Sequence, residues 1–259
     1  MSSRTCLVTG AASGIGEATA ARLRSQGHTV IGADLANADI HADLGTAEGR
    51  GELVARAREL TGGRLDAVIS CAGTAALEPP TVRVNHFGAV ATLEGLRPLL
   101  AAGTDPRAVV VSSVASVHPC DPAIVDAALA GDEPAAVAAA QAAADRGESH
   151  LIYGSSKAAL SRWVRRTAVT GDWAGAGIPL NAVAPGTVVT PMTAPMLADP
   201  DVRRIVDAGV PMPLHGHAAP DAVATLLTWL TSAENTHITG QVVFLDGGAD
   251  AVLRGDSTW

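Results

Sequence analysis

Short runs rich in valine and isoleucine alternate with longer helical stretches along most of this chain. The runs are TCLVTG from residue 5, HTVIGAD from residue 28, LDAVISCAG from residue 65, AVVVSS from residue 108, PLNAVAPG from residue 179 and GQVVFLDGG from residue 240. Such alternation is typical of repeated strand–helix–strand units, whose crossovers are right-handed. The sequence therefore predicts an α/β fold, a doubly wound parallel sheet of the Rossmann type, as a single domain over residues 1–259.

The composition supports one large core and excludes several classes of partner. The chain has 259 residues, of which 47% are hydrophobic, and a formal net charge of −8 without a run of Lys or Arg. Nucleic acids and anionic membranes require clustered positive charge, so neither is an expected partner. No apolar run approaches the ~20 residues of a membrane-spanning helix, and the N-terminus lacks a secretory signal pattern. Cys6, Cys71 and Cys120 lack metal-ligand spacing, so we expect no metal, no disulfide and a reducing, cytoplasmic location.

A glycine-rich loop follows the first predicted strand. The segment TGAASGIG places Gly10, Gly14 and Gly16 directly before a helical stretch. Glycines here permit a tight turn, a close approach of the backbone to a pyrophosphate and close packing of the helix on the sheet, while the first helix amides face the anion. The position of the loop between a strand and a helix predicts a dinucleotide site.

The second predicted strand ends in an acidic residue that bears on the choice of cofactor. Asp34 lies 24 residues beyond Gly10, where a carboxylate can accept hydrogen bonds from the hydroxyls of an adenosine ribose. A 2′-phosphate would be repelled there, and neither Ser13 nor Leu35 supplies a compensating cation. The sequence therefore predicts NAD rather than NADP as the cofactor. The alternative is an aspartate that only caps a turn.

The only tyrosine and the only lysine of the chain, Tyr153 and Lys157, stand four residues apart. Residues at this spacing share a helix face, so the phenol and the ammonium can point into one pocket. We expect the ammonium, together with a positively charged nicotinamide ring, to lower the pKa of the Tyr153 hydroxyl. Arginine would keep the charge but not the compact shape that fits beneath a ribose. The alternative is a half-buried tyrosine and an exposed lysine without a chemical role.

Four motifs in order resemble the short-chain dehydrogenase/reductase family: TGAASGIG, VNHFG from residue 84, YGSSK from residue 153 and NAVAPGTVVT from residue 181. The resemblance implies hydride transfer between a nicotinamide and a secondary alcohol or ketone, with Tyr153 as acid/base and Lys157 bound to the nicotinamide ribose. It also implies that a serine at the end of VVVSS binds the substrate oxygen. Because strand residues alternate in direction, we assign this role to Ser113 over Ser112.

The resemblance also implies roles for further residues. Asn85 matches an asparagine in a kinked helix that holds a water, which links Lys157 to solvent as a proton relay. Asp43 resembles the acid at the adenine edge, Thr190 resembles the threonine that binds the carboxamide, and Cys71 replaces a sheet-supporting asparagine. The residues expected to contact the cofactor are Gly10, Ser13, Gly14, Ile15, Gly16, Asp34, Leu35, Asp43, Leu44, Cys71, Ala72, Gly73, Tyr153, Lys157, Pro185, Gly186, Val188 and Thr190.

Two segments depart from the strand–helix alternation. Residues 121–147 carry Asp then Pro at two expected helix starts and a Gly at the end of each helical stretch. This pattern predicts a helical hairpin inserted at about 118–150. This hairpin separates Ser113 from Tyr153, two residues that lie much closer together in most of the family. We expect it to cover a dimer surface on the Tyr153 helix or to form a lid over the substrate. Residues 186–220, rich in proline and methionine, predict a mobile apolar flap.

The insertion narrows the expected substrate. Together with SSVASVH, CAG and the ending DGGADAVLR, it resembles the bacterial 3-alpha-hydroxysteroid dehydrogenase/carbonyl reductase branch of the family, and coniferyl-alcohol dehydrogenases are similar. The resemblance implies a bulky apolar alcohol or ketone as substrate and a homodimer or homotetramer. The alternative from another class is an NAD-sensing regulator without turnover. We expect the histidines, His86 and His118 included, to be structural or solvated.

Overall fold

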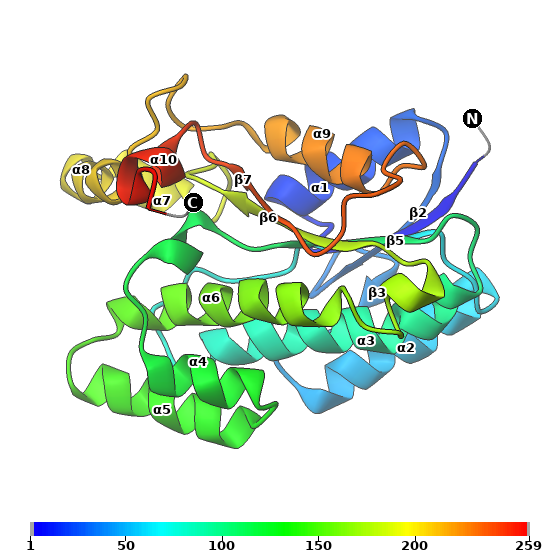
Figure 1. Cartoon of the computed structure of the whole chain (residues 1–259), viewed down its shortest axis with the longest axis horizontal. Coiled ribbons are helices and arrows are strands. Elements are labelled where there is room, and N and C mark those ends of the chain that lie inside the picture. Colours follow the sequence, from blue (N-terminus) through cyan, green and yellow to red (C-terminus); the bar gives the residue numbers. More distant parts are fainter. Residues whose placement is uncertain (1–2, 258–259) are drawn as a thin grey trace.

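A seven-stranded parallel sheet forms the centre of the molecule in the computed structural model, which describes residues 3–257 (Figure 1). The strands are β1 (Thr5–Thr9), β2 (Thr29–Asp34), β3 (Ile40–His41), β4 (Ala67–Ser70), β5 (Arg107–Val111), β6 (Leu180–Pro185) and β7 (Val242–Leu245). Their order is β3-β2-β1-β4-β5-β6-β7. The six strands predicted from the sequence are confirmed. The additional strand β3 was missed because two residues are too short to show a pattern.

Helices cover both faces of the sheet. They are α1 (Gly14–Ser25), α2 (Ala47–Thr61), α3 (Ala89–Ala101), α4 (Pro122–Leu129), α5 (Glu133–Asp145), α6 (His150–Thr167), α7 (Ala194–Ala198), α8 (Pro200–Gly209), α9 (Pro220–Leu230) and α10 (Ala249–Arg254). A π-helix, η1 (Arg83–Gly88), and two 3-10 helices, η2 (Val114–Val117) and η3 (Ala174–Ala176), complete the described elements. Figure 1 shows α1 and α9 on one face and α2, α3 and α6 on the other. The predicted doubly wound α/β fold is confirmed.

Side chains of one strand pack in two separate cores, one on each face of the sheet. In β1, Leu7 packs in the cluster that contains α2, α3 and α6 residues, whereas Cys6 and Val8 pack in the cluster with α1 and α9 residues. All three side chains are completely buried. Because a parallel sheet is covered on both faces, its strands are apolar at successive positions and show no polar alternation.

The predicted helical hairpin forms as α4 and α5. The Asp121 carboxylate accepts a hydrogen bond from the Ala123 amide (2.8 Å), and Asp132 caps α5 through the Ala135 amide (2.9 Å). Gly131 and Gly147, which follow the two helices, have positive φ angles of 76° and 77°. The hairpin packs against α6 and η1 through a third apolar cluster. Figure 1 shows it as an added layer beneath α6, away from the sheet.

Residues 186–220 contain more regular structure than an apolar flap. They include α7 and α8, the second of which begins at Pro200 after the capping residue Asp199. Proline at the first helical position is a start signal that the sequence interpretation did not use. Every side chain of α8 is at least partly exposed. The mobility of this segment stays a prediction.

The order of strands reverses between β1 and β4, which lie side by side although β2 and β3 separate them in the chain. Open α/β sheets bind ligands at such a point, beyond the carboxyl ends of the strands. The glycine loop after β1 and the CAG segment after β4 meet there. Within residues 3–257, every helix is too short or too polar to span a bilayer.

Candidate active site

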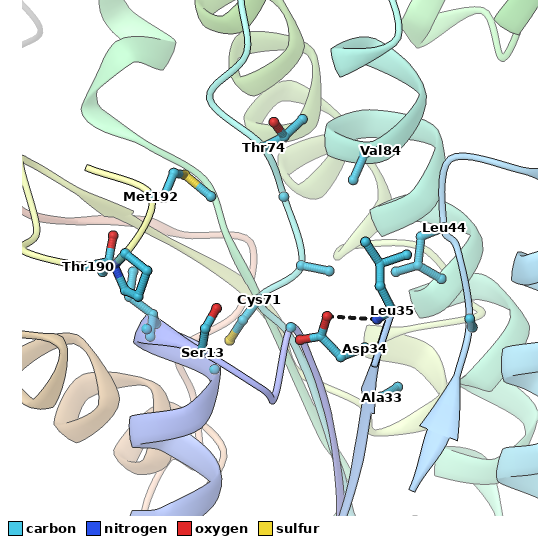
Figure 2. A pocket seen from close by; sticks show the side chains of 18 of the residues that line it. Ser13, Ala33, Asp34, Leu35, Leu44, Cys71, Thr74, Val84, Thr190 and Met192 are labelled. Carbon is cyan, nitrogen blue, oxygen red and sulfur yellow. Dashed lines mark hydrogen bonds between the residues drawn. The ribbon is translucent and has the colours of Figure 1, made fainter. Parts of the chain in front are cut away.

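A cleft at the carboxyl edge of the sheet brings the predicted cofactor residues together (Figure 2). One part, of about 270 Å³, is lined by the glycine loop and the ends of β2 and β4. A second part, of about 110 Å³, is lined by Ser113, Tyr153 and Lys157. The residues shared by both walls are Ile15, Cys71, Gly73, Thr74, Thr190 and Met192. The two parts are therefore continuous, and of the predicted site residues Asn85 alone lies outside these walls.

The glycine loop is a tightly packed backbone turn at the N-terminus of α1, in which side chains at two positions would collide with neighbouring backbone atoms. Gly10 has a φ of 68°, and a Cβ atom there would lie 2.9 Å from the Ala72 amide nitrogen. A Cβ atom on Gly16 would lie 2.0 Å from the Gly10 carbonyl oxygen. The side chain of Ser13, just before α1, lines the cleft and does not cap the helix. This backbone cradle at a helix N-terminus fits a diphosphate.

The Asp34 carboxylate both closes a turn and faces the cleft (Figure 2). Its oxygens accept hydrogen bonds from the Ala12 amide (2.9 Å) and the Leu35 amide (2.7 Å). A carboxylate has about four lone-pair positions, so capacity remains for a ligand hydroxyl. The turn-capping interpretation and the ribose interpretation are therefore compatible. Asp43, also in the wall, accepts a hydrogen bond from the Gly45 amide (2.8 Å).

Lys157 is held in place by the backbone of the sheet. Its Nζ donates a hydrogen bond to the Val111 carbonyl at the end of β5 (2.9 Å) and lies 6.0 Å from the centre of the Tyr153 ring. The side chain is nearly completely buried, and burial lowers its pKa to about 8. Lys157 is therefore not the exposed lysine that the alternative interpretation expected.

The expected direction of the Tyr153 pKa shift is wrong for the groups that the chain itself supplies. Burial raises the pKa of the Tyr153 phenol, and a hydrogen bond with the Ser113 side chain opposes this in part. The Lys157 ammonium does not reverse the effect of burial, because it is directed to the Val111 carbonyl rather than to the phenol oxygen. Burial therefore favours the neutral phenol of Tyr153 in the free protein.

The two neighbouring serines have different surroundings. The Ser113 hydroxyl lies in the cavity with Tyr153 and accepts a hydrogen bond from the Ala115 amide (3.1 Å). The Ser112 hydroxyl is engaged with α6, through the Ser161 hydroxyl (2.7 Å) and the Lys157 carbonyl (3.3 Å). This difference favours Ser113 as the substrate-facing serine.

Asn85 lies behind the cavity wall in the π-helix η1. Its amide group pairs with the backbone of Thr74, accepting from the amide and donating to the carbonyl, both at 2.9 Å. The π-helix is the kink that the family resemblance implied, since such bulges widen a helix and often lie at functional sites. A Cβ atom on Gly73 would lie 3.1 Å from Asn85 Oδ1 and 3.6 Å from Lys157 Nζ. A side chain at Gly73 would therefore crowd the Asn85 amide, whereas Lys157 Nζ lies at an ordinary contact distance.

Cys71 occupies the wall between the two parts of the cleft (Figure 2). Burial raises the pKa of its thiol to about 12, with Lys157 opposing the shift, so the thiol is a weak nucleophile. The Thr9 hydroxyl accepts hydrogen bonds from the amides of Cys71 and Ala72, both at 3.1 Å. Thr9 thus supports the strand end beside the position where the family has asparagine.

Several wall residues were missed. They are Ala33, Ala42, Thr74, Val84, Val111, Ser112, Pro191, Met192 and Thr193. Most are small or apolar, and nothing in their residue type indicates a binding role. No residue of 121–147 lines either part of the cleft, so the cavities do not support the interpretation of the hairpin as a lid. His118 is also absent from the walls, and its side chain lies beside the backbone of Gly209 at the end of α8.

Comparison with known proteins agrees with this geometry. A family model described as short chain dehydrogenase matches residues 4–128, and one described as Enoyl-(Acyl carrier protein) reductase matches residues 108–250. The 3-alpha-hydroxysteroid dehydrogenase/carbonyl reductase of Comamonas testosteroni is 38% identical over 96% of this chain and 97% of its own length. A 3-oxoacyl-[acyl-carrier-protein] reductase of Thermotoga maritima is 28% identical over 95% of the chain and 97% of its own length.

A solved structure extends the similarity to three dimensions. The crystal structure of the 3-alpha-hydroxysteroid dehydrogenase from Pseudomonas sp. B-0831, complexed with NADH, superposes with a TM-score of 0.89 and 41% sequence identity. The match covers 97% of this chain and 99% of that one. The resemblance first indicated by four short motifs therefore extends over nearly the whole molecule, and the chain belongs to the short-chain dehydrogenase/reductase family.

Proposed function

We propose that this chain is an NAD(H)-dependent oxidoreductase that interconverts a secondary alcohol and its carbonyl compound. The observation that carries the proposal is the continuous cleft that joins the glycine loop to Tyr153, Ser113 and Lys157. A dinucleotide held by the loop would extend toward these three side chains. Two relatives with 38% and 41% identity, both named as 3-alpha-hydroxysteroid dehydrogenases, support the same reaction class.

The polar side chains at the Tyr153 end of the cleft are each assigned a separate role in proton transfer. In oxidation the carbinol carbon loses a hydride, for which bound NAD would be the acceptor, and the hydroxyl loses a proton. The Tyr153 oxygen would take that proton as the phenolate, a form that the Lys157 ammonium and the positive nicotinamide ring of bound NAD would favour, and the Ser113 hydroxyl would hold the substrate oxygen. In reduction Tyr153 returns the proton to the carbonyl oxygen, starting from the neutral phenol that burial favours. Lys157 and Asn85 meet at Gly73 behind the site, where they would relay the proton to solvent.

The adenosine end of the cleft supports NAD rather than NADP. The Asp34 carboxylate faces the cleft where a ribose would lie, and a 2′-phosphate would meet like charge there. The neighbouring Leu35 side chain lines the same wall and offers no compensating cation. The Pseudomonas relative was solved with NADH, which agrees with this choice.

The substrate is proposed to be bulky and apolar, of the steroid-like or the aryl and terpene class. The wall near Tyr153 includes Val188, Pro185 and Met192, and methionine adapts to irregular apolar ligands. The names of the two steroid-dehydrogenase relatives support the steroid-like class.

The test is NADH formation with NAD and a panel of a 3-alpha-hydroxysteroid, coniferyl alcohol, a terpene alcohol and a simple secondary alcohol. We expect turnover of at least one bulky member and a loss of at least about a hundredfold in Tyr153→Phe. NADH binding by fluorescence should survive in that variant. Undiminished turnover in Tyr153→Phe would contradict its role. If no member of the panel were oxidised while NADH still bound, the result would favour the NAD-sensing regulator.

The assembly is proposed to be a homodimer or homotetramer. Helix α4 packs closely on α6 through Ile124 and Val125 and covers part of the α6 surface. A dimer formed through another face of the molecule is therefore expected rather than a tetramer that uses α6. Light scattering that shows a tetramer stable to dilution would oppose the dimer.

A further inference from the structure

Arg50, on α2, connects three segments that are far apart in the sequence. Its Nε donates a hydrogen bond to the Leu44 carbonyl (2.7 Å), and its Nη2 donates to the Arg83 carbonyl (3.1 Å). The guanidinium also forms a bidentate ion pair with Glu133, with N–O distances of 2.6 and 3.2 Å. Leu44 belongs to the cleft wall, Arg83 begins η1, and Glu133 begins α5 of the hairpin.

The first two of these segments shape the adenosine end of the cleft. Asp43 and Leu44 line it directly, as does Val84, the residue after Arg83. The segments also approach closely, since a Cβ atom on Gly88 of η1 would lie 2.9 Å from the Leu44 Cβ. A shift of Arg50 would therefore move the backbone on both sides of the place where an adenine base would lie.

The hairpin holds Arg50 from outside the cleft. Only 13% of the Arg50 side chain and 28% of the Glu133 side chain are exposed, so solvent screens this pair less than an open surface pair. Planar bidentate pairing also fixes the orientation of the guanidinium, which a single contact would not do. Arg83 lies beside the same carboxylate, with its Nε 3.7 Å from Glu133 Oε1.

We propose that Glu133 and Arg50 are positioning residues through which the inserted hairpin keeps the adenosine end of the dinucleotide site in shape. The hairpin thus contributes to cofactor affinity although none of its residues lines the cleft. The effect acts through the Leu44 and Arg83 carbonyls, and it is separate from the chemistry at Tyr153. The proposal rests on the proposed function only in taking the ligand to be an NAD-type dinucleotide.

The test compares Glu133→Gln with the matched control Glu148→Gln. Glu148 lies just after α5 and pairs with Arg146 at 2.8 Å, at the other end of the hairpin from Glu133 and away from the cleft walls. Dissociation constants for NADH, from fluorescence titration, and for ADP-ribose, from calorimetry, are measured for the wild type and both variants. We expect Glu133→Gln to raise both constants by about three- to tenfold, and Glu148→Gln to leave both unchanged.

Kinetic and coupling measurements separate positioning from general damage. At saturating NAD, kcat and the KM of the alcohol should be unchanged in Glu133→Gln, while the KM of NAD rises. The double variant Arg50→Met with Glu133→Gln should bind NADH no more weakly than Arg50→Met alone, because the two residues act as one unit. Arg50→Lys, which keeps the charge without the bidentate geometry, serves as a milder second variant if Glu133→Gln does not fold, and should weaken NADH binding as well.

Three results would overturn the inference. They are an unchanged NADH affinity in folded Glu133→Gln or Arg50→Lys, an equal loss of affinity in Glu148→Gln, and a loss for NADH without a matching loss for ADP-ribose. Failure of the wild type to bind NADH would instead overturn the proposed function. The two failures are therefore distinguishable.

Discussion

The two helical additions to this sheet, α4 with α5 and α7 with α8, each contain a helix that begins in the same way, but the additions are packed in opposite ways. In both, an aspartate caps a helix that starts with proline, Asp121 before α4 and Asp199 before α8. The first addition buries its apolar side, with Ile124 completely inaccessible. In the second, the Ile205 side chain on α8 is 73% exposed.

The difference in packing shows that one addition is part of the buried framework and that the other borders the cleft. The α4–α5 hairpin shares a core with α6 and η1, the two elements that carry Tyr153 and Asn85. Its contribution is therefore to the stability of the catalytic framework. The segment that leads into α7 supplies Thr190, Met192 and Thr193 to the cleft, while α8 adds little buried surface. Loosely packed segments of this kind open at low free-energy cost.

The comparison predicts unequal effects of the same truncation. Ile124→Ala should lower the free energy of unfolding by about 3 kcal/mol, because it leaves a cavity in the third core cluster. Ile205→Ala should change it by less than about 0.5 kcal/mol, since that side chain is mostly in solvent. Urea unfolding followed by circular dichroism measures both. Equal losses would show that α8 is as firmly packed as the hairpin.

Lowering the pH should reduce the stability of the protein, because protonation of His86 disturbs its contact with the hairpin. The Nε2 of this buried side chain donates a hydrogen bond to the Ala128 carbonyl of α4 (3.0 Å), and burial lowers its pKa to about 4. The unfolded chain titrates near pH 6.5, so between these values it binds more protons than the folded chain does. The stabilisation by neutral His86 is complete above about pH 6.5 and decreases as pH falls toward 4, by roughly 2 kcal/mol.

The measurement is the free energy of unfolding between pH 7 and pH 4.5 for the wild type and His86→Gln. The difference in slope between the two proteins isolates the contribution of His86. His237→Gln, at an exposed site beyond α9, is the control and should keep the slope of the wild type. Identical slopes for His86→Gln and the wild type would contradict the assignment.

Removal of the two capping aspartates should also affect the stability of the two additions differently. Asp121→Ala should lower the free energy of unfolding by about 1 kcal/mol or somewhat more, because Asp121 is buried, caps α4 and pairs with Arg146 at 2.8 Å. Asp199→Ala removes an exposed cap and should fray α8 with little effect on global unfolding. Hydrogen exchange of the amides in each helix locates the change. Asp121→Asn, which can still cap, should recover part of the loss.

The smallest expected change in stability, with a change in function, is at Met192. This side chain is 48% exposed and lines both parts of the cleft. Met192→Ala should change the free energy of unfolding by less than about 0.5 kcal/mol and raise the KM of a bulky apolar substrate severalfold. Steady-state kinetics at saturating NAD checks this. An unchanged KM would place the substrate away from this segment and weaken the comparison.

Prediction from the sequence was most complete where a residue type is tied to a backbone requirement. Glycines at Gly10 and Gly16 are required by close backbone contacts, and Asp34 is the last residue of β2, so the end of the strand fixes its position. The apolar wall residues, such as Val84 and Ala33, could not be found, because the same residue types also fill the core. The rise of the Tyr153 pKa in the free protein was not predicted, since burial depends on elements distant in the sequence.

The sequence by itself determined the strand–helix alternation, the glycine loop, the Tyr153–Lys157 pair and both helices of the hairpin. Each of these follows from residues close together in the chain, where steric limits and helix periodicity act directly. The tertiary structure alone decided where the hairpin packs, that Lys157 is held by the Val111 carbonyl, and that Arg50 joins Leu44, Arg83 and Glu133. Apart from the contact between Arg50 and Leu44, these contacts join residues tens of positions apart. Their geometry is fixed only when the packed layers exclude water and set the direction of each side chain.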